Sequence, residues 1–370
     1  MSIQKKLFDN CSNLNRQGFV AVENAKNNEV SHWVSIESKS NQLSLFQKLS
    51  PEGMSHSVEF YDSLCKYGSK IIKTKEPKLI EKNITFNHID YKFEIRPALL
   101  KHKSSGEVYH YFPGPREEFV EVALRKLLTE QQQHTEEEDQ GENGSRAASI
   151  IITLQQLRDE LKRNGHTYNG SELNEALNIL KYTQLSITGN YKDISGEFNG
   201  PIIELIKVYS KDNDLNKTFL KIRFHPLIQH AIYNDNSYHR YNYQIEMQLS
   251  SQLARWLLKR LYNRFRYAEF HKTYEIKATT VRNEGPVNPH ITIRRILEDI
   301  KRALNELKKT NIIASDSLNT FEAYSFKPIY SKSSGGRPRL LDAYFTIHPS
   351  SGFIDDIKED NRVSKYVSLS

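Results

Sequence analysis

The sequence predicts an α+β fold in which one order of elements occurs twice along the chain. In each half, apolar residues first recur at the three- and four-residue spacing of amphipathic helices, and later alternate with polar residues as in strands. Helices followed by a twisted strand pair are the order of a winged helix-turn-helix. The halves share no clear residue-level identity, so the repeat is one of pattern. We therefore expect two tandem winged helix-turn-helix domains behind a partly flexible N-terminal region.

Charge is distributed unevenly along the 370 residues, a length that suits two or three domains. The formal net charge is +7. Between Arg240 and Phe345 there are 19 Lys and Arg against 10 Asp and Glu, a net of +9 (19 − 10). From His134 to Arg146 the balance is reversed, with five acidic residues against one basic residue. A cationic C-terminal half beside an acidic loop favours a nucleic-acid partner.

Cysteine usage and hydropathy argue against several classes of protein. Only Cys11 and Cys65 are present, so we expect free thiols and neither a disulfide framework nor a CxxC metal site. No apolar run approaches the roughly 18 residues that a membrane span needs. The N-terminus becomes polar too early for a secretory signal. We expect a cytoplasmic protein that binds DNA and has no membrane partner.

The first half of the chain divides at residue 82. Residues 1–82 are rich in Ser, Asn, Lys and Gln, which favours the flexible N-terminal region. The first winged-helix domain is expected over 83–240, with a Thr153–Gln156 capping box and a helix stop at Asn164-Gly165. Its expected elements are two or three strands over 84–112, a helix after 113–115, an acidic loop at 134–146, a strand at 150–152, helices over 154–165 and 171–184, and strands at 185–188, 202–209 and 219–224.

The second winged-helix domain is expected over 241–350, followed by a polar tail over 351–370. A helix over 249–265 has Ser250 as its expected cap. The remaining expected elements are a strand at 273–276, a short helix at 279–284, the recognition helix at 288–312, and wing strands at 321–330 and 341–347.

The segment 288–312 predicts an amphipathic recognition helix. Asn288 suits the N-cap and Pro289 the first helical position. Ile293, Ile296, Leu297, Ile300, Leu304 and Leu307 form one apolar stripe, and the basic residues face the other way. Arg294 and Arg295, in the first turns, are the candidates for base or phosphate contact. Lys301 and Arg302 are better placed for phosphates, while Lys308 and Lys309 suit a solvated end.

Weaker candidates for DNA contact lie in the first domain and in the second wing. Asn174, Asn178 and Lys181 occupy exposed positions of the first expected recognition helix, and Asn can pair with adenine. An exposed helical Asn is also common without a ligand. Arg337 and Arg339 follow two glycines at the wing tip, where they could contact the DNA backbone or a minor groove. A basic loop of this kind also occurs with no ligand.

A short motif lies in the polar N-terminal region: Gln42, Leu43, Ser44, Leu45 and Phe46. Burial of Leu45 and Phe46 in a partner's pocket would contribute about 1.5–3 kcal/mol each, with Gln42 supplying directional hydrogen bonds. The pentapeptide resembles the consensus by which bacterial proteins dock on the replicative sliding clamp. The alternative is an ordinary amphipathic helix start.

Catalytic and cofactor signatures are missing from the sequence. There is no GxxxxGK[ST] and no HxH or HExxH pair, so a P-loop NTPase and the usual metal-dependent nickase or protease are not supported. Tyr238, Tyr241 and Tyr243 lack the surrounding groups of a tyrosine nucleophile, and we expect them to be core or interface aromatics. We predict no enzymatic activity, cofactor or metal.

The tandem winged helices together with the Gln42–Phe46 motif resemble the iteron-binding plasmid replication initiators of the TrfA-like type. The likeness is strongest at that motif, at Leu249–Phe265 and at Ile293–Leu297. It implies binding of origin repeats (iterons) in double-stranded DNA, help in melting an adjacent segment, and recruitment of the sliding clamp. Contacts with a replicative helicase and a host initiator, a monomer–dimer switch and plasmid copy control are also implied. A transcriptional regulator and a helicase-loading interaction protein are the alternative hypotheses.

Overall fold

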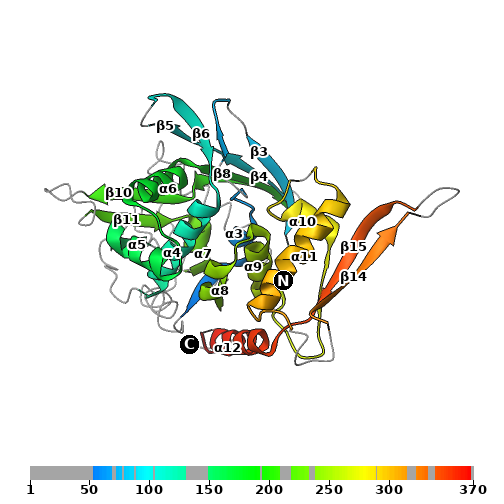
Figure 1. Ribbon diagram of the computed structural model, residues 1–370. Coiled ribbons are helices and arrows are strands. Elements are labelled where there is room, and N and C mark those ends of the chain that lie inside the picture. Colours follow the sequence, from blue (N-terminus) through cyan, green and yellow to red (C-terminus); the bar gives the residue numbers. More distant parts are fainter. Residues whose placement is uncertain are drawn as a thin grey trace, which may run out of the picture.

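The computed structural model describes residues 53–367 with several gaps (Figure 1). The gaps are 69–71, 77–78, 87–88, 103–104, 131–148, 192–193, 209–217, 233–237, 289, 315–321 and 332–337. The clamp-like motif at 42–46, Cys11 and the acidic loop at 134–146 therefore lie outside the described residues. Within the described ranges, no helix is long and apolar enough to cross a membrane.

The first winged helix is built on a three-stranded sheet in the order β10-β11-β7. The predicted capping box at Thr153 is confirmed, as is the stop at Asn164 and Gly165, where Gly165 has φ +84°. Asn169 caps the next helix in the same reciprocal way with Glu172. The elements of the first winged helix are α4 (Pro115–Glu130), β7 (Ser149–Thr153), α5 (Leu154–Arg163), α6 (Gly170–Tyr182), β10 (Ile203–Val208) and β11 (Phe219–Phe224).

The second winged helix repeats this connectivity, with its sheet in the order β13-β15-β14. In the first sheet, β11 pairs with both β7 and β10. In the second sheet, β15 pairs in the same way with both β13 and β14. The α+β class and the two winged helices are thus confirmed. The elements are α9 (Gln252–Arg264), β13 (Tyr274–Lys277), α10 (Ala278–Glu284), α11 (Ile293–Lys309), β14 (Tyr324–Tyr330) and β15 (Leu340–Ile347).

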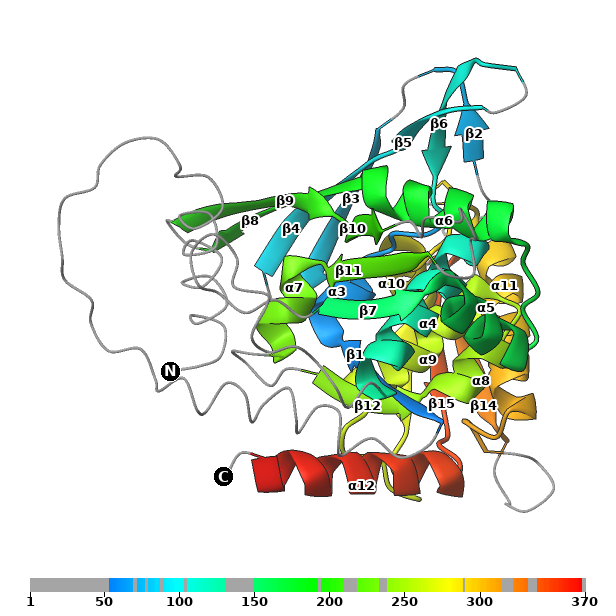
Figure 2. The same ribbon diagram turned by 90° about the vertical axis from the view of Figure 1, so that its left-hand side faces the viewer.

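Two further sheets belong to the first half of the chain. One has the order β3-β4-β8-β9, and the other β2-β6-β5, which stands beside α6 in Figure 2. The strand predicted at 185–188 is present, as part of β8. It pairs with β4 and β9, so the prediction that it belongs to the first wing is wrong. The bounds are β2 (Ile72–Thr74), β3 (Ile80–Phe86), β4 (Ile89–Arg96), β5 (Ala98–Lys101), β6 (Val108–Phe112), β8 (Gln184–Tyr191) and β9 (Ile194–Pro201).

The centre of the molecule contains residues that the composition predicts to be flexible. β1 (Met54–Val58) pairs with β12 (Tyr238–Asn242), and α3 (Glu59–Ser63) packs against α9. Tyr61 and Leu64 are buried, so the prediction of a flexible region up to residue 82 is wrong for this part. Long-range pairing with β12 orders it, which local composition cannot reveal. Two short helices, α7 (Pro226–His230) and α8 (Tyr243–Gln248), flank β12 in the chain.

The predicted polar tail is also wrong, because α12 (Ser351–Val367) packs against the second winged helix. Phe353, Ile354 and Ile357 are buried on one side of it. The Ser350 hydroxyl accepts a hydrogen bond from the Phe353 amide at 3.0 Å, which caps the helix start. A cap followed by apolar residues at helical spacing is the signal that the sequence carries for this helix.

A buried ionic joint links the two winged helices. Asp62 of α3 accepts two hydrogen bonds of 2.9 Å from Arg125 of α4, and Lys259 of α9 lies 3.8 Å from the same carboxylate. Lys259 also pairs with Glu246 at 2.8 Å. Burial alone would raise the pKa of Asp62, but Arg125, Lys259 and Lys66 outweigh it and hold that pKa well below its usual value. The joint is one of the contacts that hold the second module against the first.

Candidate nucleic-acid interface

The apolar side of α11 forms part of the core of the second module, as the sequence predicts. Its buried residues are Ile296, Leu297, Ile300, Ala303, Leu304 and Leu307. The predicted N-cap is wrong: Thr292 caps the helix, its hydroxyl accepting from the Arg295 amide at 3.3 Å. Asn288 instead accepts from the amide of His290 at 2.9 Å in a local turn. Pro289 lies outside the described residues. The helix thus begins later, and Arg294 and Arg295 occupy its first turn.

The opposite side of α11 presents arginines. Arg294 and Arg295 are exposed, and Arg294 makes no ion pair with any residue that the structure describes. Arg295 lies 3.3 Å from Glu298 and 3.7 Å from Asp299, and Arg302 also pairs with Asp299. Surface pairs of this kind contribute at most about 1 kcal/mol, so an incoming phosphate can replace the carboxylates.

Lys301 is fixed by the wing. Its ammonium lies 3.8 Å from the ring centroid of Phe326 in β14, a cation–π contact between the recognition helix and the wing strand. Farther along, Lys308 is half-buried and Lys309 is exposed. The segment of α11 from Arg294 to Lys309 contains six basic and three acidic residues, a net charge of +3 (6 − 3). This face therefore has the charge that a phosphate backbone requires.

The wing itself is a strand pair beside α11. Where the strand pair meets its connecting loop, the Ser331 amide donates to the Arg339 carbonyl at 2.8 Å, and the Arg339 amide donates to the Ser331 hydroxyl at 3.0 Å. The Arg339 side chain is exposed, while Arg337 lies outside the described residues. Sequence reasoning missed Lys327, an exposed residue of the edge strand β14, although the alternation along 324–330 could have indicated it.

The recognition helix of the first module, α6, is placed differently. Asn174 accepts a 2.8 Å hydrogen bond from Lys207 and donates to the Gly170 carbonyl at 2.8 Å, and Asn178 lies 3.4 Å from the same lysine ammonium. Ile179 packs against Ala98 and Tyr111 of the β2-β6-β5 sheet. Asn174 and Asn178 line a groove together with Leu100, Lys101, His102 and Ser171. These asparagines are engaged inside the protein, and Lys181 is half-buried beside Tyr182.

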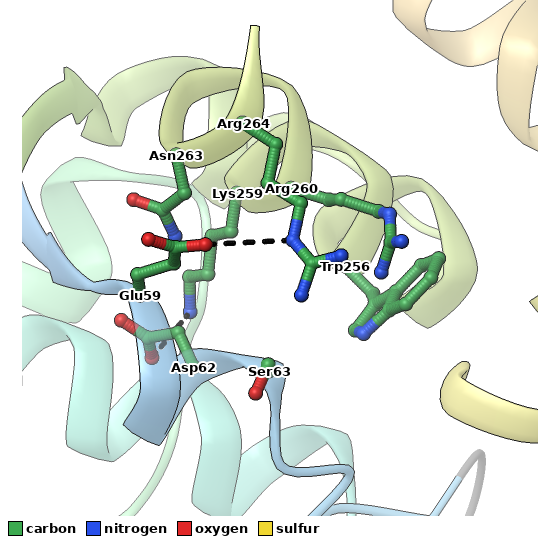
Figure 3. Close-up of a pocket in the computed structure, with 8 residues that line it drawn as sticks. All are labelled: Glu59, Asp62, Ser63, Trp256, Lys259, Arg260, Asn263 and Arg264. Atoms are coloured by element: carbon green, nitrogen blue, oxygen red, sulfur yellow. Dashed lines mark ion pairs between the residues drawn. The ribbon is translucent and has the colours of Figure 1, made fainter. Parts of the chain in front are cut away.

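A small pocket lies between α3 and α9 (Figure 3). It is lined by Glu59, Asp62, Ser63, Trp256, Lys259, Arg260, Asn263 and Arg264. Its cations are already paired, Lys259 with Asp62, Arg264 with Glu59 at 3.5 Å and Arg260 with Glu284 at 2.6 Å. Burial is the main cause of the raised pKa of Glu59. The pocket is therefore a polar part of the joint between the modules.

Metal ligands do not gather in the described part of the chain: no group of three or more His, Cys, Asp or Glu side chains there could hold an ion. Cys65 is buried and free. Tyr241 and Tyr243 are buried, in agreement with the prediction that they are core aromatics.

These features define a tandem winged-helix protein whose second module presents an uncovered basic helix. No family model and no curated protein matches the chain. Two structures of RctB domains 2 and 3 are similar to it, with TM-scores of 0.41 and 0.40 and identities of 11% and 10%. They cover 74% and 82% of this chain, and 92% and 99% of their own.

The Pi initiator protein in complex with iteron DNA is also similar, with a TM-score of 0.36 and 15% identity, over 62% of this chain and 94% of that one. The assignment of two winged helices to this chain comes from its own strand orders, β10-β11-β7 and β13-β15-β14.

Proposed function

We propose that this chain is a non-enzymatic replication initiator that binds direct repeats in double-stranded origin DNA through its second winged helix. The single observation that supports this is α11: its apolar side is buried in the core, while Arg294, Arg295 and Arg302 are exposed beside a wing. A helix in this position is the element that winged helices insert into the major groove.

The geometry suggests a division of labour on the DNA. Arg294 and Arg295 lie in the first turn of α11, where a bidentate contact with guanine would discriminate by about 1–3 kcal/mol. Arg302 and Lys301 lie two turns later and would contact phosphates, which fix register. Arg337 and Arg339 of the wing would add backbone contacts.

Recruitment of the replication machinery would depend on Gln42–Phe46. The motif ends seven residues before Gly53, where the described part of the chain begins (53 − 46). Clamp binding, helicase and host-initiator contacts, origin opening and copy control are parts of the proposal that rest on the sequence resemblance. A protein with this role would act in the cytoplasm, on plasmid DNA.

The test first searches the DNA beside the gene for direct repeats, and then measures fluorescence anisotropy with a duplex that carries them, compared with a shuffled duplex of equal length. Arg294→Ala and Arg295→Ala are each expected to weaken repeat binding by about 1–3 kcal/mol while hardly affecting the shuffled duplex. Lys358→Ala, an exposed lysine of α12, is the matched control. Equal losses on both duplexes would make these arginines phosphate contacts, and no preference for repeats would refute the proposal.

A transcriptional regulator with the same winged helices would give the same DNA result. Leu45→Ala combined with Phe46→Ala separates the two hypotheses, because an initiator should lose capture of the sliding clamp in a pull-down while its repeat affinity stays unchanged. If the unaltered chain captures no clamp, the regulator or the helicase-loader hypothesis is favoured.

A further inference from the structure

The sheet of the second winged helix has an outer face that repeat binding does not use. On the inner face, Phe326 of β14 stacks on the buried Phe345 of β15 at 5.9 Å, and Lys301 of α11 lies over Phe326. Side chains alternate along a strand, so neighbours of these residues point the other way. Figure 1 shows β14 and β15 at the edge of the molecule, with α11 on one side of them.

One cross-strand row on this outer face joins an aromatic ring and two cations. Tyr344 of β15 is directly opposite Lys277 of β13 and Lys327 of β14. Neighbouring strands are about 4.8 Å apart, so the backbones of the two lysines are about 10 Å from each other, with the tyrosine between them. The Lys277 ammonium lies 5.1 Å from the Tyr344 ring centroid.

The charges of this row are available to a ligand. Lys277 and Lys327 are exposed and pair with no carboxylate in the described ranges. Asp342, on the same strand as Tyr344, is occupied by the amide and hydroxyl of Thr279 at 3.0 and 2.6 Å. Glu275 is the nearby exposed anion on β13, two positions from Lys277. Cations thus outnumber free carboxylates around the ring.

We propose that the row Lys277–Tyr344–Lys327 binds single-stranded DNA. A base would stack on Tyr344 and the flanking phosphates would lie beside the two lysines. Aromatic rings flanked by cations are the shared chemistry of surfaces that bind single strands, because every base has a face to stack and every linkage a charge. Bases within a duplex are already stacked on each other, so the row selects an unpaired strand. This site is separate from the repeat-binding face and does not depend on it.

The experiment measures anisotropy of the full chain with a labelled thymidine homopolymer of roughly 20 nucleotides, which covers a typical single-strand site and cannot pair with itself. Tyr344→Ala is expected to weaken binding roughly tenfold, about 1.4 kcal/mol. Tyr344→Phe keeps the ring and should bind like the unaltered chain. Lys277→Ala with Lys327→Ala should reduce the slope of log affinity against log salt by about 1.4, or about 0.7 for each phosphate that the lysines no longer neutralise.

Matched controls are available in the same chain. Tyr267→Ala removes a tyrosine that is 79% exposed in the same module, and Lys358→Ala removes an exposed lysine of α12; both should leave binding unchanged. Thermal melts establish that each variant is folded, and the two lysines can be replaced without opening the core, since both are exposed. Unchanged binding in both Tyr344→Ala and the lysine pair would overturn the proposal.

The repeat-binding arginines provide the remaining control. Arg294→Ala with Arg295→Ala should weaken the repeat duplex but leave the homopolymer affinity intact. If the double arginine variant abolishes homopolymer binding while the Tyr344 and lysine variants do not, single strands bind at α11 and the outer sheet face is not the site. Failure of repeat binding by the unaltered chain, in contrast, would refute the proposed function without affecting the outcome for the homopolymer.

Discussion

The two winged helices of this chain share a strand order but differ in what their recognition helices face. In the second module, the polar side of α11 carries exposed arginines next to the wing. In the first, α6 packs on a neighbouring sheet through Ile179, and Asn174 is hydrogen-bonded to Lys207. A repeated fold therefore does not imply a repeated function: what covers the helix decides whether it is available to DNA.

The largest expected effect concerns the joint that holds the two modules together. Asp62→Ala would remove the buried carboxylate that pairs with both Arg125 and Lys259, leaving Lys259 only its pair with Glu246. We expect the free energy of unfolding to fall by about 3–5 kcal/mol in urea denaturation. Asp299→Ala, which removes a surface pair of α11, should cost less than about 1 kcal/mol. Comparable values for the two variants would show that the joint contributes no more than a surface pair.

The buried carboxylates Asp62 and Asp360 predict that the stability of the fold depends on pH. The pKa of Asp62 is held below its usual value in the folded chain, as is that of Asp360. Burial alone would raise the pKa of Asp360, but His239, 3.5 Å away, and Arg266, 2.5 Å away, outweigh it. A lowered folded-state pKa stabilises the fold above the unfolded value of about 4 and less as pH falls below it. Urea midpoints measured from pH 7 to pH 3 should decline mainly below about pH 4. A flat profile would contradict this account.

The next-largest expected effect is the difference in repeat affinity between variants of the two recognition helices. Asn174→Ala with Asn178→Ala should leave repeat affinity unchanged, because Lys207 and Gly170 already engage these groups. The arginine variants of α11 are expected to lose about 1–3 kcal/mol in the same anisotropy titration. A loss of that size for the asparagine pair would mean that α6 reaches DNA after all and that the β2-β6-β5 sheet moves aside.

The smallest effect sharpens the description of α11. Asp299→Asn removes the carboxylate that Arg295 and Arg302 share, so both guanidinium groups become freer to contact phosphate. Repeat affinity should increase by about 0.5 kcal/mol, roughly twofold, with a smaller gain at high salt. Weaker binding would indicate that Asp299 orients the arginines rather than competing for them.

Local signals allow much of the fold to be predicted. The Thr153 capping box, the Gly165 stop and the apolar stripe of α11 each depend on residues within one or two turns of each other, and all three are confirmed. The predicted start of α11 is wrong because Asn288 also suits a turn, and Thr292 caps the helix instead. The α12 helix is absent from the prediction although Ser350 and the apolar residues after it carry its signal.

The sequence by itself determined the two winged helices and the basic face of α11, because amphipathic spacing and capping are properties of neighbouring residues. Tertiary structure alone decided that β1 joins β12, that α6 is covered by β5 and β6, and that Asp62, Arg125 and Lys259 meet in one buried joint. Those contacts join segments far apart in the chain, and their energy comes from burial and pairing across that separation, which no local pattern records.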